Sequence, residues 1–125
     1  MFYEQVFSRG NKGDVIIIRF QLISFENINF LQTYFINKHQ YRSNTDLKIS
    51  LDDINDILNR IDRVQENNDL AIELLPTSDI ECGNSKYNQL YFNELEEVKK
   101  GLSKIKDEWD EGNENYLFTS WLYNF

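Results

Sequence analysis

The sequence is short of the residues from which metal sites, disulfide frameworks and membrane spans are built. Among its 125 residues there is one cysteine, Cys82, and one histidine, His39. A zinc site needs three or four such ligands and a disulfide needs a second cysteine, so neither is expected. The longest apolar run, Val15 to Ile18, is far below the roughly 20 residues of a membrane-spanning helix. We therefore expect no metal, no other cofactor and no membrane contact.

A targeting signal is also missing. The N-terminal stretch MFYEQVFSRG does not show the basic-then-apolar order of a secretory signal peptide. A single cysteine fits a reducing compartment, and together these observations predict a cytoplasmic protein. Hydrophobic residues make up 41% of the chain and aromatic residues 14%, enough for one packed core. We expect a single domain over residues 1–125.

Basic residues are scarce in the second half of the chain. Residues 1–64 hold eight acids and eight bases, whereas residues 65–125 hold thirteen acids and five bases. The second half therefore carries the whole net charge of −8. Neutralising nucleic-acid phosphates requires clustered Lys and Arg, so we expect no direct nucleic-acid binding. Anionic membrane surfaces are disfavoured for the same reason. A protein partner, in particular a basic one, fits this charge.

The first third of the chain predicts a β-hairpin followed by a helix. FYEQVF and VIIIRFQLIS are suited to strands, and RGNKGD between them supplies the glycines and asparagine of a tight reversal. Ser24 is then predicted to cap a helix that begins at Phe25. The apolar residues that recur on one face of this helix are Phe25, Ile28, Leu31, Tyr34 and Phe35.

The middle of the chain holds the clearest amphipathic helix. A short strand is expected at Leu47 to Ile49, and Ser50 with Asp53 forms a variant of the capping box. The apolar residues that follow at helical spacing are Leu51, Ile54, Ile57, Leu58, Ile61 and Val64. Asn67 and Asn68 are predicted to end this helix in the left-handed conformation. A short turn from Asp69 to Leu75 should end at Pro76.

The last third predicts a polar loop, a long helix and a final strand. The loop runs from Thr77 to Lys86, with a short strand at Asp79 to Cys82, and Ser85 opens the helix. The expected buried stripe of the helix is Tyr87, Leu90, Tyr91, Leu95, Val98, Leu102, Ile105 and Trp109. Gly101 within it predicts a close approach of another backbone. With a strand over Tyr116 to Phe125, the fold class is α+β: a small, mostly antiparallel sheet packed with about three helices.

Catalytic patterns are weak. His39 and Cys82 lie on different segments without the third, orienting group that a nucleophilic pair needs. Asp79 with the triplet Glu97-Val98-Lys99 is a nuclease-like set that any charged helix produces by chance. Gly10 and Gly13 lack the following helix that would hold a phosphate. We expect no enzymatic activity.

Two surfaces are candidates for binding a partner. The first is a run of acids without an intervening base, namely Asp107, Glu108, Asp110, Glu111 and Glu114, which either imitates nucleic-acid phosphates or is an ordinary solvated face. The second is aromatic: Phe92 lies off the buried stripe, and Trp121 lies near the C-terminus. Exposed aromatic residues beside acids are typical of a protein-binding patch, although most aromatics of this region are expected in the core.

Several separated features of the second half resemble one family. The segments are ISLDDINDILNRIDRV, the stretch AIELLPTSDIECGNSKYNQLYFNELEEVKKGL, and YLFTSW. The positions that carry the likeness are Leu75, Pro76, Gly83, Tyr87, Tyr91, Leu95, Ser120 and Trp121. In this Leu-Pro break, Tyr-started helix and aromatic-Ser-Trp ending, the chain resembles a family of small uncharacterised tailed-phage and prophage proteins. The resemblance implies a phage-borne accessory protein in the host cytoplasm.

Origin and charge together lead to a functional hypothesis. We expect an acidic phage or prophage protein that binds and inhibits a host protein, with a basic defence nuclease such as a CRISPR effector as the leading candidate. The acidic residues would engage the nuclease's nucleic-acid-binding groove, as an anti-CRISPR protein can, and the aromatics would anchor the contact. The alternative is a self-associating structural or accessory phage protein, with the aromatic patch as the face of a homodimer.

Overall fold

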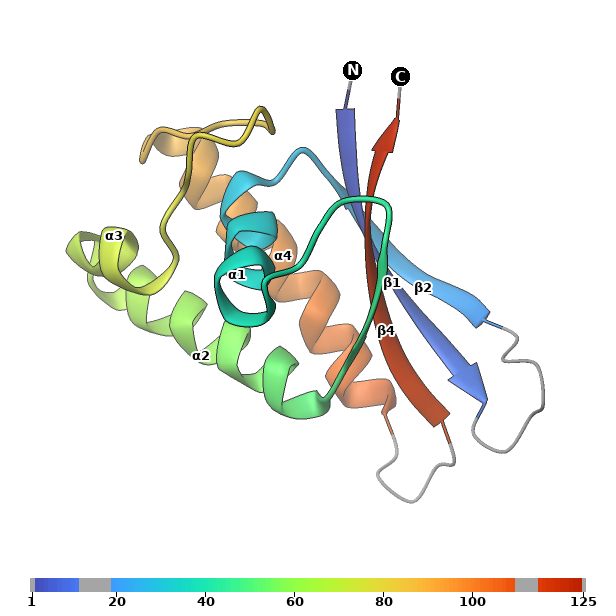
Figure 1. Ribbon diagram of the computed structural model, residues 1–125. Helices are drawn as coiled ribbons and strands as arrows, with labels where there is room; N and C mark the ends of the chain where they lie inside the picture. The colour runs from blue at the N-terminus through green and yellow to red at the C-terminus, as the bar shows by residue number, and fades with distance from the viewer. Residues whose placement is uncertain (1, 12–18, 110–114, 125) are drawn as a thin grey trace.

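The computed structural model describes residues 2–11, 19–109 and 115–124. In these residues the chain forms β1 (Phe2–Asn11), β2 (Arg19–Glu26), α1 (Asn29–His39), β3 (Asp46–Ile49), α2 (Leu51–Glu66), the 3₁₀ helix η1 (Asn68–Leu70), α3 (Ala71–Leu74), α4 (Gln89–Glu108) and β4 (Asn115–Asn124). The four strands form one antiparallel sheet, and the helices pack on one of its faces (Figure 1). This confirms the predicted α+β class, with the short α3 beside three long helices.

The sheet places the two ends of the chain next to each other. Its strand order is β2-β1-β4-β3, so that β1 and β4 are the central strands. They pair along their whole length, from Phe2 opposite Asn124 to Asn11 opposite Asn115. Figure 1 shows both termini at the same end of the sheet.

The face of the sheet that meets the helices is aromatic. Phe7 on β1 packs edge-on against Phe25 on β2, with ring centroids 6.0 Å apart. Phe7 also meets Phe35 of α1 at 6.1 Å. All three side chains are buried, as is Trp121 on β4. Burying aromatic groups of this size supplies much of the free energy that holds the helices on the sheet.

The first helix begins later than predicted. Phe25 belongs to β2, which pairs with β1 as far as Glu26 opposite Glu4. Asn27 then reverses the chain in the left-handed conformation (φ 53°), and its Oδ1 accepts a hydrogen bond of 2.8 Å from the backbone N–H of Tyr3. Pairing with β1 thus overrides the cap predicted at Ser24, and α1 starts at Asn29.

The second helix confirms its sequence signals, except at its end. Ser50 and Asp53 form the capping box, and the residues predicted on the apolar face of α2 are buried or half-buried. The helix ends at Asn67 as expected, but Asn67 is extended (φ −145°, ψ 100°) rather than left-handed. In that conformation its side-chain Oδ1 accepts a hydrogen bond from the backbone N–H of Asp69 and so caps η1.

The long helix also begins later than predicted. Residues 77–88 form a loop without the strand expected at Asp79 to Cys82, and α4 starts after Asn88 rather than Ser85. Asn88 Oδ1 accepts a hydrogen bond from the backbone N–H of Tyr91, which caps the helix. Gly101 does lie against another segment, but the neighbouring atoms are side chains and not the predicted backbone: a Cβ there would lie 2.5 Å from Cζ of Phe25 on β2.

Candidate protein-binding surface

An apolar groove lies between the short α3 and the start of α4. It is a hollow of about 320 Å³, and its lining residues are Asn68, Asp69, Ala71, Ile72, Tyr87 and Phe92. We call this set the apolar groove. Ile72 is 68% exposed, Tyr87 is 37% exposed and Phe92 is half-buried. An isoleucine this exposed beside two partly exposed aromatic rings is typical of a surface that another molecule covers.

Ile72 faces outward because of the helix to which it belongs. α3 buries Ala71 and Leu74, and the following Leu75 is buried as well. On so short a helix, the position directly after Ala71 is turned away from the core. Arg60 Nη1 donates a 2.8 Å hydrogen bond to the carbonyl of Leu74, which fixes the end of α3. The packing that anchors α3 therefore leaves Ile72 on the surface.

The aromatic wall of the groove is fixed by its neighbours. Tyr91 is fully buried and meets Tyr87 at 5.2 Å and Phe92 at 5.1 Å between ring centroids. Its hydroxyl donates a 2.8 Å hydrogen bond to the carbonyl of Leu75. The hydroxyl of Tyr87 accepts a hydrogen bond of 3.1 Å from the backbone N–H of Thr77. Tyr87 and Phe92 are thus held in place around a buried ring.

One acid lines the groove and others lie near its residues in the sequence. Asp69 lines it, and Glu66 ends α2 just before it; both are exposed. Glu73 follows Ile72 but lines the hollow between α1 and α2. Glu96 lies one turn after Phe92 on α4, where its carboxylate accepts a 2.9 Å hydrogen bond from Gln65. On the same side, Lys99 pairs with Asp62 at 3.0 Å, and Lys86 precedes Tyr87. Without Glu73, these residues comprise four acids and two bases, a net charge of −2.

Of the two aromatic residues expected to bind a partner, the structure places only Phe92 on the surface. Trp121 is 7% exposed and packs against Tyr3 at 5.2 Å between ring centroids. The expectation of an exposed Trp121 is wrong because β4 is a central strand, whose helix-facing side chains are covered. Tyr87 was expected on the buried stripe, but it precedes the helix and is partly exposed.

The acidic run predicted at the end of α4 is described only in part. Asp107 and Glu108 are exposed at the last turn of α4. Asp110, Glu111 and Glu114 lie outside the described residues. Asp107 is 15 residues after Phe92, roughly 22 Å along the helix axis at 1.5 Å per residue. The structure therefore separates the predicted acidic site from the aromatic one.

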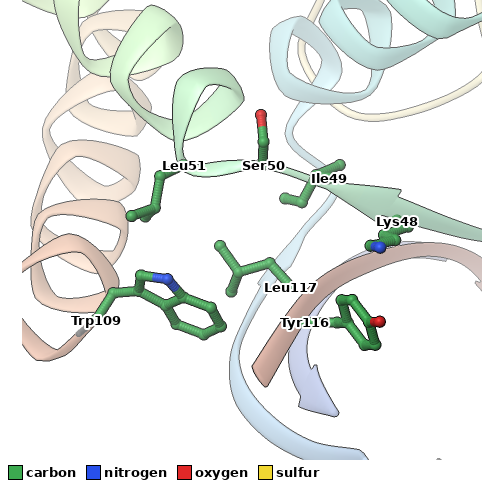
Figure 2. Close-up of a pocket in the computed structure, with 7 residues that line it drawn as sticks. All are labelled: Lys48, Ile49, Ser50, Leu51, Trp109, Tyr116 and Leu117. Atoms are coloured by element: carbon green, nitrogen blue, oxygen red, sulfur yellow. The ribbon is translucent and has the colours of Figure 1, made fainter. Parts of the chain in front are cut away.

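A second hollow, of about 240 Å³, lies where the end of α4 meets β3 and β4. In Figure 2 the side chains of Leu51, Trp109 and Leu117 face one another across it. Lys48 lies at its edge, with Nζ 3.7 Å from the ring centroid of Tyr116. None of the residues drawn in Figure 2 is acidic, so Asp107 and Glu108 do not line this hollow.

A third hollow, of about 330 Å³, holds an ionic network between α1 and α2. The Tyr34 hydroxyl donates a 2.6 Å hydrogen bond to Asp56, and Arg60 donates one of 3.1 Å to the same oxygen. Lys38 Nζ pairs with Asp53 at 2.8 Å. Burial, and then the hydrogen bond to Asp56, raise the pKa of Tyr34 to about 12. Tyr34 is therefore neutral at pH 7, and Lys38 and Arg60 beside it are paired with Asp53 and Asp56.

The histidine and the cysteine are not brought together. His39 is the last residue of α1, and its Nε2 lies 3.1 Å from Asp53. Cys82 lies at the other end of α1, where its carbonyl accepts a 2.8 Å hydrogen bond from Asn29, the first residue of the helix. These two ends of α1 are roughly 15 Å apart. Burial and the nearby charge of Glu94 raise the pKa of the Cys82 thiol to about 12, so it is not a thiolate at neutral pH.

Glu94 is a buried acid near the aromatic wall. It lies on α4 and faces the core, and its Oε1 has no hydrogen-bond partner among the described residues. Burial, with repulsion from Glu97, raises the pKa of Glu94 to about 7. Glu94 therefore changes charge near neutral pH.

The described part of the chain offers no group of three or more His, Cys, Asp or Glu side chains arranged to hold a metal ion. Within the same residues, every helix is too short or too polar to cross a bilayer. No protein-family model, no curated protein and no solved structure matches the chain. The resemblance to a phage family thus stays a prediction.

Ile72 is the residue of the groove that the sequence analysis missed. The segment AIELLP contains one apolar residue more than a single turn of helix can bury. If Ala71, Leu74 and Leu75 are placed on the buried face of this turn, Ile72 must lie on the opposite, exposed face. The extra apolar residue can be recognised in the sequence. It indicates a binding surface only when Tyr87 and Phe92 are known to line the same hollow.

Proposed function

We propose that this protein acts by binding another protein through the apolar groove. The observation that carries the proposal is Ile72, which is 68% exposed and lines the same hollow in the surface as Tyr87 and Phe92. Fully burying an isoleucine side chain contributes about 1.5–3 kcal/mol, so covering this groove is favourable for a partner. Partly exposed aromatic residues held in fixed positions are common anchors of protein interfaces.

We further propose that the protein is a phage or prophage inhibitor of a host protein, with a basic, nucleic-acid-binding defence nuclease as its target. The acidic surroundings of the groove and the exposed Asp107 and Glu108 support this proposal, because nucleases bind their substrates through basic surfaces. The sequence resemblance described above supports the phage origin. A host nuclease implies action in the bacterial cytoplasm.

The test has two parts. The tagged protein is purified from bacterial cells with and without a resident defence nuclease, and co-purifying proteins are identified by mass spectrometry. Nuclease cleavage of DNA is then measured against increasing amounts of the purified protein. We expect inhibition that is complete near one equivalent and weakens with added salt. A nuclease that remains fully active at large excess of the protein contradicts the proposal.

Self-association is the second candidate, and one observation favours it. β2 is an edge strand that pairs only with β1 among the described residues, and its Phe20 is 50% exposed. Edge strands of this kind pair readily with a second copy. Light scattering at high protein concentration tests this alternative. A monomeric mass contradicts it, whereas a dimer that Phe20→Lys dissociates supports it.

A further inference from the structure

We infer that the apolar groove binds a short basic segment of the partner that carries a single large apolar side chain. This inference rests on the proposed function and adds the chemistry of the partner to it. Three features of the groove lead to it: its size, its apolar walls and the sign of its charge.

The size and walls of the groove define the anchor. At about 320 Å³ the hollow is at the lower end of the volumes found for ligand pockets. A hollow this small accommodates one large side chain rather than a row of them. Ile72 forms one wall, and the rings of Tyr87 and Phe92 form the other. Such a site favours Leu, Phe or Trp, which gain free energy by leaving water.

The charge around the groove defines the residues next to the anchor. Asp69 lines the groove beside Ile72, and Glu66 ends α2 three residues before Asp69. Glu96 lies one turn after the lining residue Phe92 on α4. Glu73 lines the neighbouring hollow between α1 and α2 and does not line the groove. Lys or Arg next to the anchor would meet the carboxylates of Asp69, Glu66 and Glu96, and an acidic segment would be repelled. The aliphatic parts of Lys and Arg also cover apolar walls well.

One base on this surface is already engaged. Lys99 lies on α4 one turn after Glu96, but its Nζ is 3.0 Å from Asp62 and donates a 3.1 Å hydrogen bond to Gln65. Gln65 in turn donates to Glu96. Lys99 is thus paired with Asp62 of α2. Lys86, exposed directly before Tyr87, is the other base, and the acids Asp69, Glu66 and Glu96 outnumber it.

The test uses defined peptides and does not depend on the natural partner. The probe is a synthetic peptide with one Trp flanked on each side by two Lys. One counterpart has Glu in place of the Lys, and another has Ala in place of the Trp. Binding to the ¹⁵N-labelled protein is followed by amide chemical shifts. We expect saturable shifts in residues 68–73 and 87–96 with the Lys peptide, and at least about tenfold weaker binding for each counterpart.

Matched variants separate the groove from general charge attraction. Ile72→Ser should weaken the Lys peptide about tenfold. Leu90→Ser should not weaken it, because Leu90 is 53% exposed on the first turn of α4 but does not line the groove. Asp69→Asn with Glu96→Gln should weaken binding and reduce its dependence on salt. Asp52→Asn with Glu26→Gln, at two exposed acids that do not line the groove, is the matched control and should leave binding unchanged.

Each outcome has a distinct meaning. Equal binding of the Lys and Ala peptides, or equal effects of Ile72→Ser and Leu90→Ser, overturns the inference about the groove. Inhibition of a nuclease that survives Ile72→Ser overturns that inference while the proposed inhibitory function stands. Selective peptide binding in the groove without inhibition of any nuclease supports the inference and contradicts the inhibitory function.

Discussion

The amide of Asn29 binds the loop before α4 to the start of α1. Its Nδ2 donates hydrogen bonds to the carbonyls of Cys82 (2.8 Å) and Ser78 (3.1 Å), and its Oδ1 accepts one from the backbone N–H of Ser78 (2.9 Å). Thr33 Oγ1 also donates to this Oδ1, at 3.0 Å. A single buried side chain thus satisfies three backbone groups of a loop that has no strand or helix of its own.

Replacing Asn29 by Ala should destabilise the protein by about 2–4 kcal/mol, because the buried backbone groups of Ser78 and Cys82 lose their partner. The free energy of unfolding in urea, read by tryptophan fluorescence, measures this loss. Asn93→Ala is the matched control, since Asn93 is exposed on α4 and accepts a hydrogen bond only from the neighbouring Gln89. Equal effects of the two changes would show that Asn29 does not anchor the loop.

Gly101→Ala should also destabilise the protein, although alanine favours helices by about 1 kcal/mol over glycine. The new Cβ would overlap Phe25 and Ile23, both at 2.5 Å, and the ring of Phe25 has little room to move in the core. We expect a net loss of about 1–3 kcal/mol in the free energy of unfolding. Lys104→Ala, on an exposed turn of α4, measures helix propensity alone. A more stable Gly101→Ala protein would mean that α4 does not lie close to β2.

Glu94 predicts a pH-dependent stability. Its pKa is about 7 in the folded protein and about 4.5 in an unfolded chain, so folding takes up a proton between these values. Stability should therefore fall as the pH rises from about 4.5 to about 7, and Glu94→Gln should abolish this fall. At pH 8 we expect Glu94→Gln to be more stable than the wild type by about 1–3 kcal/mol.

Urea unfolding of both proteins at several pH values measures this effect. Glu97→Gln is the control, because Glu97 is an exposed neighbour on α4 and should change the pH profile little. Parallel profiles of the wild type and Glu94→Gln would contradict the buried position of Glu94.

Asp53 predicts the opposite dependence at acidic pH. Burial acts to raise its pKa, but hydrogen bonds from Lys38, the Ser50 backbone and His39 outweigh burial and hold the pKa below its ordinary value. The resulting stabilisation is present above the unfolded pKa of about 3.9 and is lost as the pH falls through the folded one. Asp53→Asn should cost about 1–3 kcal/mol at pH 7 and less at pH 3. Asp52→Asn, one residue away and exposed, should cost little.

The sequence predicted the fold correctly where interactions between residues close in sequence determine the local structure. The capping box of Ser50 and Asp53 and the apolar spacing after it identified α2, because a helix end and a helix face are both short-range properties. The start of α1 was missed for the opposite reason. Phe25 fits a helical face as well as a strand, and only its pairing with Gln5 on β1, which is distant in sequence, decides for the strand.

The candidate site depended still more on long-range arrangement. Trp121 is buried because β4 lies between β1 and β3 in the sheet. No residue close to Trp121 in the sequence indicates this strand order. Phe92 was identified from its position off the buried stripe of one helix. Ile72 and Tyr87 line the same hollow as Phe92 only because α3 and the loop before α4 lie beside the start of α4.

The pairing of β1 with β4 has a consequence for how the chain folds during synthesis. β1 leaves the ribosome first, yet its partner along all ten residues is the last strand to be made. β3 also pairs only with β4 among the described residues, so the sheet cannot be completed before residue 124 has emerged. Until then, one edge of β1 and the apolar face of the helices stay uncovered. The nascent chain is therefore most prone to aggregation before β4 has emerged.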